Sequence, residues 1–146
     1  MTPQEVAAKV GEHFATSEWV EMSQERINQF ADATGDHQFI HINEEAAKMT
    51  PFGGTIAHGF LTLSLLPAMA DTAFAIDDVR MGVNYGLNRV RFVNPVAAGS
   101  RVRGHFKLLS YEPLEGGAQL TIEVSMELEG AEKPACVAQS VSRRYT

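Results

Sequence analysis

The chain has 146 residues, the usual length of one domain with a core of its own. A formal net charge of −6 and a pI near 5.3 argue against non-specific binding to nucleic acid. The first residues lack the basic start and apolar run of a signal peptide, and the lone Cys136 cannot form an internal disulfide. We therefore expect a cytoplasmic protein in a reducing compartment.

The N-terminal region predicts a helix and then a short strand. Residues 3–14 place Val6, Val10 and Phe14 at helical spacing. Residues 18–22 (EWVEM) have the composition of a short strand.

Two N-cap residues predict the next helices. Ser23 begins a helix that should end at Gly35, a residue type suited to the left-handed conformation after a helix end. Asn43 begins a short helix that runs to Met49. Asp36 should then lie in the connecting loop between these helices.

Residues 55–74 are the most apolar segment and have the length of a membrane-spanning helix. They nevertheless contain His58, Pro67 and Asp71, and they lack basic flanks and Trp or Tyr anchors. We expect a buried central helix that is kinked near Pro67, which lacks a backbone donor.

From residue 80 onward the apolar period changes from helical to two. Strands are predicted at 81–92, 102–108, 120–128 and 135–145. Because Gly- and Pro-containing turns separate the later strands, an antiparallel meander is expected. A sheet with one apolar face and an apolar helix bury each other best when the sheet curls around the helix. We expect a single α+β domain over residues 1–146.

The stretch GDHQFIH holds Asp36 and His41, five residues apart. Singly, each has a structural explanation, because Asp is a common turn residue and His41 fits a half-buried extended segment. Together, after Gly35, they can direct a carboxylate and an imidazole at one small space. Such a pair suits proton transfer to carbon or water.

A metal site is the alternative interpretation. His37 and His41 have the spacing of two zinc ligands on one helix face. The intervening Phe39 and Ile40, and the Gly-Asp before them, predict no helix there. No third ligand has a convincing spacing, so we expect no metal.

His58 and Gly59 stand at the start of the apolar helix. One interpretation is that glycine only permits close packing. The other is that the first free N–H groups of the helix stabilise a developing oxyanion.

Three segments, FADATGDHQFIHINEEAAKMTPF, IAHGFLTLSLL and VRFVNPVAAGSRVRG, resemble the MaoC-like dehydratases, the family of (R)-specific enoyl-CoA hydratases with the hot-dog fold. The resemblance covers most of the chain and is nearest to the nodulation-protein-N-like subgroup. The signature residues that fit are Phe30, Gly35, Asp36, Ile40, His41, Ala46 and Phe52. Gln38-Phe39 replaces the family's Asn-Pro, and Pro67 replaces a serine of some relatives, which bears on substrate preference more than on the reaction.

The resemblance implies a hot-dog domain, with a curved antiparallel sheet wrapped around the central helix. It makes Asp36 and His41 the catalytic pair, which adds water across the C2–C3 bond of a trans-2-enoyl thioester, and Gly59 the oxyanion donor. It implies no metal or redox cofactor, and a homodimer with its sheets joined edge to edge. A thioesterase and a non-catalytic acyl-thioester binder are the competing functions.

The residues expected to line the substrate site are Gln38, Ala57, His58, Asn84, Tyr85 and Arg91. Arg89 and Arg91 could contact the phosphates of coenzyme A, because arginine suits phosphate recognition. For Asn84 and Tyr85 an ordinary strand role is equally compatible with the pattern, and for the two arginines surface solubility is the competing explanation.

Overall fold

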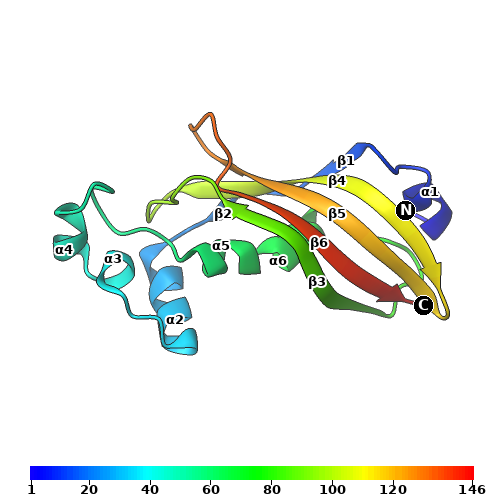
Figure 1. The fold of residues 1–146 in the computed structure, drawn as a ribbon, viewed down its shortest axis with the longest axis horizontal. Coiled ribbons are helices and arrows are strands. Elements are labelled where there is room, and N and C mark those ends of the chain that lie inside the picture. The colour runs from blue at the N-terminus through cyan, green and yellow to red at the C-terminus, as the bar shows by residue number, and fades with distance from the viewer.

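A six-stranded antiparallel sheet curves over a two-part helix in the computed structural model, which describes all 146 residues (Figure 1). In chain order the elements are α1 (Pro3–Ala7), β1 (His13–Thr16), β2 (Val20–Glu21), α2 (Gln24–Thr34), α3 (Phe39–Ile42), α4 (Glu44–Lys48), α5 (Gly59–Ser64), α6 (Leu66–Ala73), β3 (Met81–Phe92), β4 (Arg101–Leu114), β5 (Gly117–Leu128) and β6 (Cys136–Tyr145).

The strand order is β1-β4-β5-β6-β3, with β2 also paired to β4. The predicted meander is confirmed for β4, β5 and β6, which pair in sequence. The strand β3 does not pair with its successor β4. It pairs with β6 and forms one edge of the sheet.

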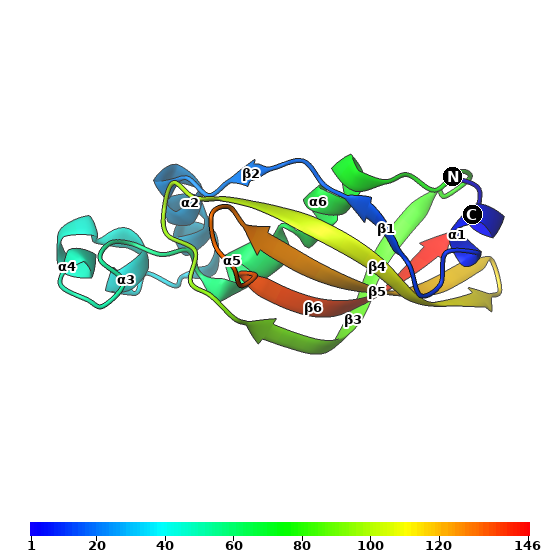
Figure 2. The ribbon, with the colours of Figure 1, turned by 90° about the horizontal axis from the view of Figure 1, so that it is seen from above.

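The core lies between the concave face of the sheet and the helices α5 and α6, as the two views in Figures 1 and 2 show. The even-numbered residues of β5 face inward, and Val124 and Met126 are completely buried. Leu61, Leu65 and Met69 face them from the helices. This arrangement confirms the predicted α+β hot-dog architecture, with an unclosed sheet.

The central helix is broken at Leu65, which ends α5 and begins α6. Pro67 lies in the first turn of α6, so the predicted kink is confirmed. The helix begins only at Gly59, and its burial is one-sided, because Phe60 and Ala68 are exposed. No helix of the chain is long and apolar enough to cross a membrane.

The prediction of one helix over residues 3–14 is wrong in its second half. The helix α1 ends at Ala7, and the left-handed Gly11 (φ 89°) turns the chain into β1. Phe14 then packs on Phe74, with ring centroids 4.9 Å apart. Phe14 is thus apolar because it packs against the core from the strand β1, and its helical spacing from Val6 and Val10 is coincidental. The strand predicted at residues 18–22 is shorter than expected, comprising only β2.

The helices α2, α3 and α4 project beyond one end of the sheet (Figure 1). The predicted caps are confirmed, because the side chains of Ser23 and Asn43 accept hydrogen bonds from N–H groups of the first turns of α2 and α4. The prediction that no helix follows Asp36 is wrong, since α3 forms one turn there. The N–H of Asn43 donates to the Phe39 carbonyl and closes that turn.

Candidate active site

Asp36 is placed by the end of α2. Gly35 adopts the left-handed conformation with φ 84°, which turns the chain away from the helix axis. The carboxylate Oδ1 of Asp36 then accepts a weak hydrogen bond from the Gln38 N–H at 3.3 Å. The side chain is exposed in the single chain, so its carboxylate is accessible to a substrate or to water.

His41 is held in one tautomer by its surroundings. It is 6% exposed, and its Nδ1–H donates to the carbonyl oxygen of Ile56 at 2.7 Å. Since a neutral imidazole carries one proton, Nε2 is left with a free lone pair and can act as a base. The carbonyl of His41 also accepts a hydrogen bond from Gln24 Nε2 at 2.8 Å, which ties α3 to α2.

His58 lies directly against His41. The two rings stack with centroids 3.9 Å apart and planes inclined by 25°. Nε2–H of His58 donates to the backbone carbonyl of Asp36 at 3.0 Å, and Phe30 covers the ring, with its centroid 4.9 Å away. Burial lowers the pKa of His58, so the ring stays neutral. Its buried Nδ1 has no hydrogen-bond partner.

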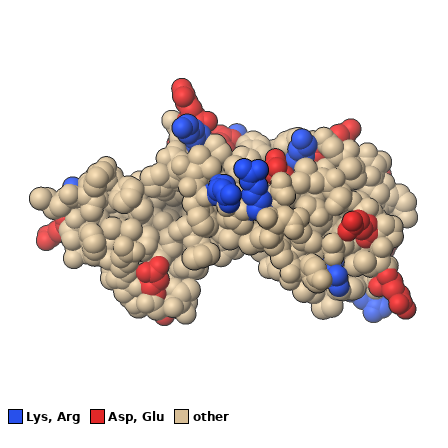
Figure 3. Space-filling model, viewed as in Figure 1, with Lys and Arg blue, Asp and Glu red and all other residues tan.

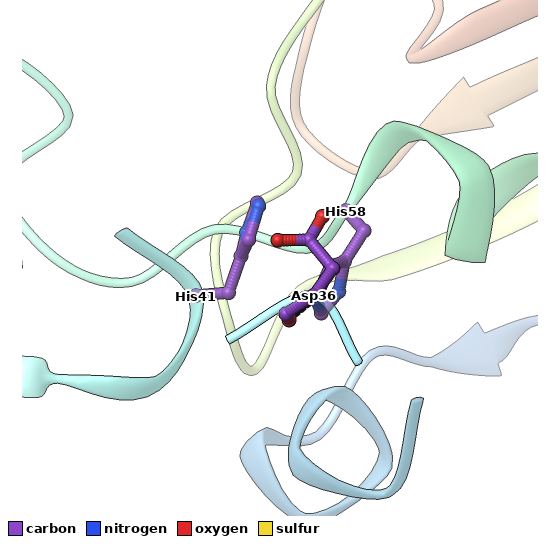
Figure 4. Close-up of side chains that lie close together, drawn as sticks. All are labelled: Asp36, His41 and His58. Carbon is purple, nitrogen blue, oxygen red and sulfur yellow. Dashed lines mark hydrogen bonds between the residues drawn. The ribbon is translucent and has the colours of Figure 1, made fainter. Parts of the chain in front are cut away.

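The three side chains converge in Figure 4, where the Asp36 carboxylate points toward the His41 ring. One potential ligand atom from each of Asp36, His41 and His58 lies within 4.8 Å of the other two. Sequence spacing did not reveal this group of three potential ligands around His41. His37, the partner that the spacing suggested, is exposed and bonds Asp32 at 2.9 Å.

Gly59 is the first residue of α5, and its N–H makes no hydrogen bond within the chain. A Cβ at this position would lie 3.2 Å from the Phe92 ring, a tight contact that a small shift of this half-exposed ring would have to relieve. Gly59 opens onto a pocket of about 220 Å³ that Ala57 and Phe92 also line. A carbonyl oxygen could therefore approach the Gly59 N–H.

The remaining predicted residues separate into two groups. Asn84 pairs with the inward-facing Ser142 and lines the space between the sheet and α6. Tyr85 lines the adjoining cavity beside α5 and α6, and its ring centroid lies 3.7 Å from the guanidinium carbon of Arg143. Arg91 pairs in register with Val137, on the outer face of the sheet, and its guanidinium donates to the backbone carbonyl of Val90.

Basic side chains gather over the middle of β3 and β6 in Figure 3, on the outer face that carries Arg89 and Arg91. In the single chain these arginines face away from Asp36 and the central helix. The side chain of Gln38 makes no hydrogen bond. Its backbone N–H donates to the Asp36 carboxylate, and its carbonyl accepts a hydrogen bond from the His41 N–H.

Sequence reasoning missed the contacts that support Asp36 and His41. Gln24 links His41 to Thr55. Its side-chain Nε2–H donates to the His41 carbonyl, and its Oε1 accepts a hydrogen bond from the Thr55 hydroxyl. Ile56 contributes only a carbonyl oxygen. No residue pattern distinguishes such contacts, because they depend on how α2 meets the segment before α5.

Comparison with known proteins identifies the family of the chain. Residues 5–129 match the MaoC like domain. The chain is 50% identical to the 3-hydroxyacyl-thioester dehydratase Z of Mycobacterium tuberculosis over 95% of this chain and 93% of the relative. It is also 50% identical to nodulation protein N of Rhizobium leguminosarum bv. viciae, over 94% and 88% of the two chains.

Among solved structures, a MaoC-like dehydratase from Rhodospirillum rubrum superimposes with a TM-score of 0.76 at 21% identity, over 93% of this chain and 92% of that one. This likeness supports the fold alone. The domain match and the two relatives at 50% identity show that the sequence is similar as well. The matched residues 5–129 include the loop with Asp36 and His41 and the start of α5. The chain is therefore an enzyme of the MaoC-like dehydratase family.

Proposed function

We propose that the chain hydrates trans-2-enoyl thioesters to (R)-3-hydroxyacyl thioesters and catalyses the reverse dehydration. The observation that carries the proposal is the convergence of the Asp36 carboxylate and the His41 imidazole beside His58. The next residue, Gly59, has a free N–H at the start of α5. The names of the close relatives support the reaction class, since one is a 3-hydroxyacyl-thioester dehydratase.

In this mechanism one water molecule lies between the carboxylate of Asp36 and Nε2 of His41. Both groups can accept its protons, because Nδ1 of His41 already carries the proton of the ring. The water oxygen bonds to C3 while one of its protons passes to the pair, and the pair delivers a proton to C2. The net change is the addition of one water across the double bond.

The N–H of Gly59 stabilises the charge that develops on the thioester oxygen as C3 is attacked. Backbone donors at a helix start are suited to this task, because they are fixed in place before the reaction begins. Glycine leaves no side chain over this donor, and a Cβ here would crowd the Phe92 ring at 3.2 Å.

We further propose that the reaction needs no metal ion. Asp36, His41 and His58 could contribute three ligand atoms. The two rings are stacked, however, so their in-plane lone pairs run side by side and do not converge on one point.

The sheet edge supports a homodimer as the working form. The strand β3 pairs only with β6, and its outer edge is unpaired over 12 residues. Its large exposed apolar side chains are Met81, Val83, Tyr85, Leu87 and Phe92. Long apolar edges are normally covered or paired. Pairing of β3 with a second copy would join the two sheets edge to edge.

The proposal is tested by mixing the protein with a short trans-2-enoyl-CoA and following the ultraviolet absorbance of the conjugated thioester. Hydration removes that absorbance without releasing free thiol, and an (R)-specific dehydrogenase should oxidise the product. A thioesterase would release free coenzyme A, and a simple binder would leave the substrate unchanged. Either of those results would contradict the proposal.

A further inference from the structure

A groove runs along one face of the central helix, away from the catalytic pair. Gly59, Leu63, Leu66, Ala70 and Phe74 follow one another at intervals of three or four residues, which places them on one stripe of α5 and α6.

Two cavities, of about 400 and 290 Å³, lie between this stripe and the strands β3 and β6. They share Leu66, Pro67, Asn84 and Ser140, so they form one continuous groove. The groove therefore extends from Leu63, one turn after Gly59, toward Phe74.

The far part of this groove is polar, although it lies against the core. Its polar lining residues are Asp71, Asn84, Ser140, Ser142 and Arg144. A tunnel that accepts only a hydrocarbon chain would have no need of these side chains, because an apolar chain leaves polar groups without partners.

Arg144 is the most informative of these residues. Its Nε–H donates to Ser142 Oγ at 3.4 Å, and its guanidinium carbon lies 5.9 Å from the centroid of the Phe74 ring. The two terminal nitrogens make no hydrogen bond, and the side chain forms no ion pair within 4.0 Å.

Burial lowers the pKa of Arg144 and the nearby Asp71 opposes that effect, while the guanidinium remains protonated. A charged guanidinium thus lines the groove with Asp71, and its two terminal nitrogens have no hydrogen-bond partner in the chain.

We propose that this polar end of the groove is a subsite for an oxygen-bearing acyl tail. The inference rests on the proposed function, and it assigns to the enzyme thioesters whose chain carries a hydroxyl, carbonyl or carboxylate oxygen far from the reacting carbons. The subsite near Ala70 lies roughly 16 Å along the helix from Gly59, at 1.5 Å per residue. Arg144 supplies the hydrogen bonds, and Asn84 and the two serines complete them.

The experiment compares three trans-2-enoyl-CoA substrates of equal chain length, with a methyl, a hydroxyl or a carboxylate end. The measured quantity is the ratio of kcat/KM for each oxygenated substrate to that for the methyl-ended one. In the wild-type enzyme at least one ratio should exceed ten, since a hydrogen bond to a charged donor is worth about 10- to 100-fold. The hydroxyl and carboxylate arms identify which oxygen is recognised.

Arg144→Met should reduce that ratio by about tenfold or more. Arg143→Gln is the matched control, because the neighbouring arginine lies on the opposite face of β6 and stacks on Tyr85. It should leave the ratio unchanged. If Arg144→Met does not fold, Asn84→Leu changes the same subsite from the exposed strand β3 and should lower the ratio in the same direction.

Two failures are distinguishable. An enzyme that hydrates all three substrates with similar kcat/KM retains the proposed function and overturns the subsite. The subsite is also overturned if Arg143→Gln and Arg144→Met change the ratio equally. An enzyme that hydrates none of the three overturns the proposed function, and with it the inference that rests on it.

Discussion

Replacing His58 by Phe separates the two contacts that His58 makes with the proposed catalytic residues, stacking on His41 and a hydrogen bond to Asp36. The Phe ring can still stack on His41, where the present centroid distance is 3.9 Å. It cannot donate to the Asp36 carbonyl, a bond of 3.0 Å in the structure. The variant therefore removes the link between the start of the central helix and the Asp36 loop while an aromatic ring is kept against His41.

The expected effect on stability is small. The lost hydrogen bond contributes about 1 kcal/mol, and the Asp36 segment is exposed, so water can replace it. The variant also removes the unpartnered buried Nδ1, whose desolvation costs about 1 kcal/mol or more. These effects oppose each other, so the free energy of unfolding should change by less than about 1 kcal/mol. Activity should fall by roughly 10- to 100-fold, because a catalytic group displaced by about 1 Å loses about that much.

The pH dependence of stability gives a second readout. Burial lowers the pKa of His58 in the folded protein below its usual value of 6.5. The unfolded chain therefore binds more protons as the pH falls through that value, and the wild type loses stability there. His58→Phe lacks this titration and should lose less stability on acidification. The hydrogen bond to Asp32 raises the pKa of His37, so the titration of His37 changes stability with pH in the opposite direction. This contribution is the same in the wild type and in His58→Phe.

The assay is steady-state hydration together with thermal melts across a pH series. His37→Phe is the matched control, because this exposed histidine occupies the same loop and bonds only Asp32. The control should retain near wild-type kcat. A His58→Phe enzyme with full kcat would refute the positioning role, and so would an activity loss explained by unfolding at the assay temperature.

Three further outcomes are expected. Exhaustive chelation should leave hydration intact, and a loss of activity that zinc restores would instead support the Asp36, His41 and His58 ligand set. Sedimentation should show a dimer, and Val83→Lys at the β3 edge should shift it toward monomer, whereas Val10→Lys, a similarly exposed position away from that edge, should not. Burial raises the pKa of the Cys136 thiol to about 11, so the native protein should resist alkylation at mildly alkaline pH and react once unfolded; rapid native labelling would contradict this.

Much of the fold was predictable because local rules dominate there. Ser23 and Asn43 cap their helices as expected, and the alternation of residues 120–128 marks the buried face of β5. The pairing of β3 with β6 was not predictable from period alone, since the period reveals which side chains face inward but not which strand lies alongside.

The candidate site was predictable only in part. Asp36, His41 and Gly59 were identified from loop position and family resemblance. The helical turn α3 was missed, because Phe39 and Ile40 are weak helix formers and the turn is held by the bond from Gln24 to the His41 carbonyl. The stacking of His58 on His41 joins residues 17 positions apart, a contact that no local pattern predicts.

The most direct test of the catalytic pair is the hydration rate of Asp36→Asn, His41→Gln and the double variant on a trans-2-enoyl-CoA, with thermal melts run alongside. Each single variant should lose about 10²–10⁴-fold in rate, the usual contribution of a positioned acid or base. The double variant should be little slower than either single one, because groups that act as a unit lose their effect together. All three should melt close to the wild type. A folded Asp36→Asn or His41→Gln enzyme that hydrates at a near wild-type rate would contradict the assignment of this pair.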